Sequence, residues 1–88
     1  MPKLAEYLKK SRENTGLSQT FVSSKLGYSS PQFVSNWERG LSHPPLKSLK
    51  KIAKLYKLRD KELFDIFVDS YLVDVESDLS KKIQKFKT

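Results

Sequence analysis

The sequence has few of the residues on which enzymes and metalloproteins depend. It contains no cysteine and a single histidine. This excludes disulfides, thiolate ligands and thiol nucleophiles, and leaves almost no material for a zinc site or a Ser-His-Asp triad. Only three glycines are present, and we interpret each as a helix stop rather than part of a phosphate-binding loop. We therefore predict no metal, no cofactor and no enzymatic activity.

Long apolar runs are also missing. No stretch of 18 consecutive apolar residues occurs, so we expect no membrane-spanning helix. The N-terminal residues lack the apolar segment and cleavage site of a secretion signal. Together with a length of 88 residues, these absences favour a small cytoplasmic binding domain without a membrane partner.

Positive charge is abundant and unevenly distributed. Residues 1–61 hold 13 Lys and Arg against 4 Asp and Glu, whereas residues 62–88 hold 4 Lys against 6 Asp and Glu. The first part is therefore suited to a polyanionic partner. Charge alone does not choose between nucleic acid, an anionic membrane surface and simple solubility.

The residue pattern predicts an all-α fold. We expect helices over about 2–14, 19–26, 31–39 and 46–56, and a fifth from about residue 61. Ser18 and Ser30 are predicted N-caps, and Asp60 is predicted to cap the fifth helix. The short turn that begins at Gly27 forces the second and third helices to cross steeply, as in a helix-turn-helix.

A polar surface on the third predicted helix suits base recognition. Gln32 and Asn36 lie one turn apart, and an amide side chain can form a bidentate pair with adenine in the major groove. Ser30 and Ser35 can contact a base edge or a phosphate, and Phe33 can contact a thymine methyl group. The alternative is an ordinary solvated helix surface.

The motifs at residues 17–19, 26–29, 34–40, 44–46 and 49–55 occur in an order that resembles the lambda-repressor-like (XRE/Cro-type) helix-turn-helix family. The resemblance spans residues 4–67 and implies a five-helix domain that binds operator DNA, usually as a dimer. Between Gly27 and Glu38 the chain has one residue more than the usual form. From the helix surface and the resemblance together, the candidate DNA-binding residues are Gln19, Ser29, Ser30, Gln32, Phe33, Ser35, Asn36, Arg39, Ser42 and His43.

Two charged residues fall on apolar helix faces. Arg12 follows Leu8 by one turn, and Glu38 follows Val34 by one turn. Breaking a buried ion pair costs about 3–5 kcal/mol, so we predict that Arg12 and Glu38 pair and join the first helix to the third. The resemblance implies the same bridge. The alternative is that Arg12 extends to solvent and contacts a phosphate.

The last third is rich in apolar residues. Nine of the fourteen residues from 62 to 75 are apolar, more than one small core can cover. We predict a symmetric homodimer through Phe64, Phe67, Val68, Tyr71, Leu72 and Val75. The alternatives are a larger intrachain core with a frayed tail, and a short dimerising strand over residues 71–76. Leu79, Ile83 and Phe86 continue the helical spacing, so the helix is expected to extend or to restart near Ser77.

These observations together predict a DNA-binding domain at residues 1–67 and a dimerising extension at residues 68–88. The predicted function is a homodimeric repressor of bacterial or phage type that places its third helix in the major groove of double-stranded DNA. The alternative is an antitoxin-like interaction module whose C-terminal third binds a partner protein.

Overall fold

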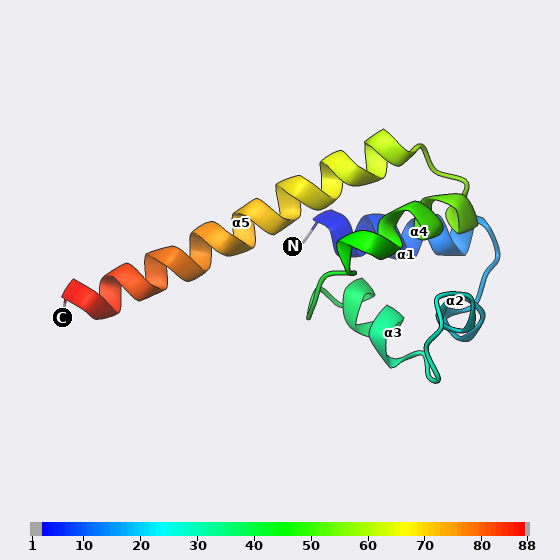
Figure 1. Ribbon diagram of the computed structural model, residues 1–88, viewed down its shortest axis with the longest axis horizontal. Coiled ribbons are helices and arrows are strands. Elements are labelled where there is room, and N and C mark those ends of the chain that lie inside the picture. The colour runs from blue at the N-terminus through cyan, green and yellow to red at the C-terminus, as the bar shows by residue number, and fades with distance from the viewer. Residues whose placement is uncertain (1–2, 88) are drawn as a thin grey trace.

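The computed structural model describes residues 3–87, and every regular element in that range is a helix (Figure 1). This confirms the predicted all-α, five-helix fold. Pro2, the predicted start of the first helix, lies outside the described residues. The elements in chain order are α1 (Lys3–Asn14), α2 (Gln19–Lys25), α3 (Gln32–Glu38), the 3₁₀ turn η1 (Leu46–Ser48), α4 (Leu49–Tyr56) and α5 (Asp60–Lys87).

Local capping sets the boundaries of α2. The Ser18 hydroxyl accepts a hydrogen bond from the backbone N–H of Phe21 at 3.0 Å, as a serine N-cap should. At the other end Gly27 adopts φ +90°, a left-handed conformation that other residues rarely adopt. This allows the backbone N–H of Tyr28 to bond back to the Ser23 carbonyl at 2.9 Å. The helix therefore ends within a short turn and redirects the chain into α3.

Two predicted helix starts differ from the structure. α3 begins at Gln32, with Pro31 as the flanking residue and no side-chain cap. The Ser30 hydroxyl accepts from the Gln32 N–H only at 3.4 Å, so it is not the predicted cap. The predicted helix at 46–56 divides into η1 and α4, because the first turn after Pro45 closes with a three-residue bond from the Ser48 N–H to the Pro45 carbonyl.

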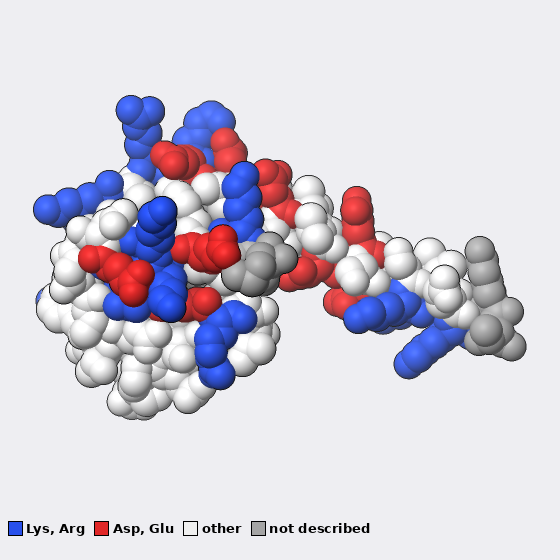
Figure 2. All heavy atoms as spheres, turned by 180° about the vertical axis from the view of Figure 1, so that it is seen from behind, with Lys and Arg blue, Asp and Glu red and all other residues white. Residues whose placement is uncertain are grey.

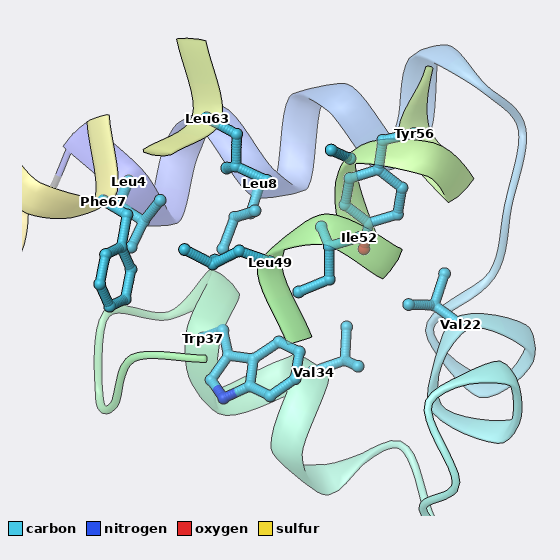
Figure 3. Close-up of a cluster of buried hydrophobic side chains, with 11 residues drawn as sticks. Leu4, Leu8, Val22, Val34, Trp37, Leu49, Ile52, Tyr56, Leu63 and Phe67 are labelled. Atoms are coloured by element: carbon cyan, nitrogen blue, oxygen red, sulfur yellow. The ribbon is translucent and has the colours of Figure 1, made fainter. Parts of the chain in front are cut away.

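One hydrophobic core joins all five helices (Figure 3). Leu8 of α1, Val22 of α2, Val34 of α3, Ile52 of α4 and Leu63 of α5 are each at most 2% exposed. Burying such an aliphatic side chain contributes about 1.5–3 kcal/mol relative to leaving it exposed. The inner faces of α2 and α3 are thus fixed by the core, which leaves their outer faces for contacts with other molecules.

α5 is a single helix of 28 residues whose second half extends away from the body (Figure 1). It already includes Asp60, so Asp60 is not its cap, and it neither restarts near Ser77 nor forms a strand over residues 71–76. No glycine or proline occurs after Pro45 to stop it. Among residues 60–85, whose burial the structure describes, Phe67 is the last buried residue of this helix. Phe67 therefore belongs to the core of the single chain, which corrects its assignment to the dimer surface.

Candidate nucleic-acid interface

The turn between α2 and α3 is covered by aromatic side chains. Tyr28 is half-buried, and its ring centroid lies 4.6 Å from that of Phe33 and 5.9 Å from that of Trp37. Trp37 is buried in the core, whereas Phe33 is half exposed beside the turn. The tilted contact with Phe33 and the edge-to-face contact with Trp37 tie the turn to α3 and place Phe33 at the edge of the exposed helix surface.

The exposed side of α3 carries a connected row of polar side chains. Gln32 donates from Nε2 to Asn36 Oδ1 at 2.8 Å, and Arg39 donates from Nη2 to the same oxygen at 2.8 Å. Because a guanidinium can only donate, the Arg39 contact identifies the Asn36 atom as the carbonyl oxygen. The three side chains are therefore held in one arrangement before any ligand binds.

This arrangement determines which groups the row can offer to a base. Asn36 Oδ1 already accepts two hydrogen bonds, so Asn36 presents mainly the two N–H donors of its amide. Gln32 retains its carbonyl oxygen as an acceptor, and Arg39 retains further donors. A surface with both donors and acceptors suits the base edges of the major groove, where each base pair has a distinct pattern.

A buried charge cluster fixes α3 from behind. Arg12 donates from Nε to Glu38 Oε2 at 2.6 Å and from Nη2 to Oε1 at 3.0 Å. Its remaining nitrogen bonds to the Leu17 carbonyl at 2.8 Å. The Glu38 side chain is only 3% exposed, and hydrogen bonding to it raises the pKa of Arg12. The predicted pair is thus present, and Arg12 is directed into the protein rather than towards a phosphate.

Gln19 belongs to the same cluster. Its Nε2 donates to Glu38 Oε1 at 3.0 Å, so the first residue of α2 is tied to the last residue of α3. Gln19 is partly exposed, which leaves its carbonyl end able to contact a phosphate. The cluster therefore couples the orientation of α2 to that of α3.

The other candidate residues are divided between two places. Ser29 and Ser30 are exposed in the turn before α3, Ser35 lies on α3, and Ser42 is exposed in the following loop. His43 differs, because its Nε2 lies 2.9 Å from Asp74 of α5 and its ring contacts two aromatic rings of α5. The structure therefore does not bring His43 together with the polar row of α3.

Charge is sparse around this surface. Between Thr15 and Leu46 the only Lys and Arg residues are Lys25 and Arg39. The lower end of the body, where Figure 1 places α2 and α3, is mostly free of charged side chains in Figure 2. Most of the positive charge of residues 1–61 therefore lies on α1 and in the segment from η1 to the start of α5. Lys25, which sequence reasoning missed, lies in the last turn of α2 with Nζ 5.4 Å from the Phe21 ring centroid.

An all-helical body with a short turn between two steeply crossing helices, and a polar row on the second, defines the helix-turn-helix class of DNA-binding proteins. A family model described as helix-turn-helix matches residues 8–63. The chain therefore belongs to the lambda-repressor-like (XRE-type) helix-turn-helix family of DNA-binding regulators. Comparison with curated proteins and with solved structures gives no significant match. Among the described residues, no helix has the length and apolar character needed to cross a membrane.

Proposed function

We propose that this protein is a sequence-specific repressor that binds operator DNA as a homodimer and reads bases with α3. The observation that carries this proposal is the row of Gln32, Asn36 and Arg39, which is prearranged by two hydrogen bonds of 2.8 Å on the outer face of α3. The inner face of α3 is fixed by Val34 and Trp37 in the core. A polar helix face held on a rigid body is the element that such domains insert into the major groove.

The contacts in this proposal have separate roles. Asn36 and Gln32 read base edges, because amides offer paired donors and acceptors. Phe33, half exposed beside them, can contact a thymine methyl group. Phosphate contacts position a protein on the DNA but do not recognise its sequence. We assign them to the remaining candidates and to the cation on α2: Gln19, Lys25, Ser29, Ser30, Ser35, Arg39 and Ser42.

Selection of bound sites from a random DNA pool tests this proposal. We expect one preferred sequence with two symmetric half-sites. Asn36→Ala and Gln32→Ala should each weaken binding to that sequence by about 1–3 kcal/mol and relax one base position. Gln19→Ala should weaken all sequences more evenly.

Lys54→Ala is a matched control, because Lys54 is exposed on α4 and is not one of the candidate DNA-binding residues. It should leave the base preference unchanged. If the Asn36 and Gln32 variants both keep the wild-type base preference, α3 does not read the sequence and the proposal fails.

A further inference from the structure

The far half of α5 carries large apolar side chains that are exposed. We call residues 72–87 of α5 the tail helix. It extends beyond the body (Figure 1), and Leu72, Leu79 and Ile83 are 54%, 53% and 53% exposed. Single helices of this length are marginal in water, and valines and serines lower the helix propensity here further. A helix of this composition needs a second surface to cover it.

The apolar residues of the tail helix form one stripe. At about 100° per residue, Leu72, Val75, Leu79 and Ile83 fall within an arc of about 80°. Their spacing of three, four and four residues keeps them on one face of the helix, as a contact with another helix requires. Ser77 lies on the opposite face. The stripe is therefore shaped to contact another helix rather than a flat or irregular surface.

The stripe is also symmetric about Leu79. Val75 and Ile83 lie four positions on either side of it. If a second tail helix is placed antiparallel with the two Leu79 residues together, Val75 of each copy meets Ile83 of the other. The pattern therefore fits an antiparallel copy of itself.

The charges beside the stripe select the same direction. The acidic residues of the tail helix, Asp74, Glu76 and Asp78, precede Leu79, whereas Lys81 and Lys82 follow it. Figure 2 shows acidic side chains along the projecting helix near the body and basic ones farther out. In a parallel pair each of these charges would lie beside a charge of the same sign on the other helix, which is destabilising. In the antiparallel pair Asp78 lies on the same side of the stripe as Lys82 of the other copy, and such flanking pairs set orientation.

We propose that the tail helix pairs antiparallel with the tail helix of a second copy, centred on Leu79. This inference rests on the homodimer of the proposed function and specifies its geometry. Phe67, which is buried in the core, lies 12 positions before Leu79, so the core of each body ends about 18 Å from the centre of the pair. The two DNA-binding bodies therefore lie at opposite ends of the dimer, not side by side at one end.

Single-cysteine variants test the direction of pairing. Because the natural chain has no cysteine, each variant carries one thiol, and a disulfide forms only when the two Cα atoms lie within roughly 7 Å. Leu79→Cys should link to itself under mild oxidation. Val75→Cys mixed with Ile83→Cys should give the mixed dimer in excess over either self-linked dimer, since identical positions are about 12 Å apart in the antiparallel pair.

Ser77→Cys is the matched control, because Ser77 is exposed on the opposite face, and it should not link above background. Self-linking of Val75→Cys and of Ile83→Cys without the mixed product would indicate a parallel pair and overturn the proposal.

Sedimentation of the intact protein without DNA tests the pairing itself. We expect dimers for the wild type, and monomers for Leu79→Lys, which places two like charges at the centre of the seam. Trp37 fluorescence should show that the body of this variant stays folded. A monomeric wild type would overturn the proposal and leave the stripe to a different protein. Base preference in the DNA selection depends on α3, so it distinguishes failure of the pairing from failure of the proposed function.

Discussion

The bridge between Arg12 and Glu38 allows a quantitative test of what holds the reading helix in place. Glu38→Ala leaves the Arg12 guanidinium largely buried, since its side chain is 12% exposed. The Leu17 carbonyl remains as a hydrogen-bond acceptor for it. Removing one partner of a buried pair costs about 3–5 kcal/mol. A protein of this size has about 5–10 kcal/mol of stability in total, so we expect Glu38→Ala to lose roughly half of it.

Urea unfolding followed by far-UV circular dichroism measures this loss, and Trp37 fluorescence gives a second signal from the core. The double variant Arg12→Met/Glu38→Leu removes both charges. It should lose only about 1–2 kcal/mol, because no buried charge remains and the main cost is the hydrogen bonds of Gln19 and Leu17.

The double-mutant cycle isolates the coupling between the two charges. Arg12→Met and Glu38→Leu, each made alone, should together cost several kcal/mol more than the double variant. If the two single losses add to the double loss within about 0.5 kcal/mol, the residues do not interact energetically. The account of α3 being held by this pair would then be wrong.

Three further predictions follow from burial and charge. Phe67→Ala should lower the free energy of unfolding in urea by about 3–5 kcal/mol, because the Phe67 side chain is buried. Phe64 is 47% exposed, so Phe64→Ala should lower it by about 1 kcal/mol or less. Equal losses would contradict the assignment of Phe67 to the core. Ser23→Ala should raise the free energy of unfolding, measured in urea, by up to about 1 kcal/mol, since within the described residues the buried Ser23 hydroxyl has no hydrogen-bond partner. A decrease of more than about 1 kcal/mol would show that the hydroxyl does have a partner. A plot of the logarithm of the operator-binding constant against the logarithm of salt concentration should have a slope of about −2 per protomer, because only Lys25 and Arg39 carry positive charge near the reading surface. A slope of about −8 per protomer would mean that α1 and α4 also contact the DNA.

Features set by neighbouring residues could be predicted from the sequence. The Ser18 cap and the end of α2 at Gly27 depend on a few adjacent residues, and the structure has both. The ion pair between Arg12 and Glu38 was also predictable, because each charge interrupts an otherwise apolar helix face. In each case the physical cost of the alternative is visible in the local sequence.

Features set by the packing of distant segments could not be predicted. Phe64 and Phe67 are both apolar residues of α5, and only the rotation of that helix against the body decides that Phe67 is buried. His43 is turned away from α3 by Asp74, 31 positions later in the chain. The location of the positive charge depends on which helix faces end up on which side of the body, and the charge balance of residues 1–61 carries no such information.

The sparse charge of the reading surface and the uncovered tail helix have a common consequence. Phosphate contacts usually supply much of the affinity of a DNA-binding domain, and this surface offers two cations per chain for them. A single body should therefore bind weakly even where α3 fits the bases well. Linking two bodies makes the second binding event intramolecular and can raise affinity by a factor of about 10²–10⁴ without any new contact. Leu79→Lys should accordingly weaken binding to a two-half-site operator by a factor in that range, yet leave binding to an isolated half-site unchanged. Equal weakening on both DNAs would show that the variant damages the body itself, and the link between tail pairing and operator affinity would fail.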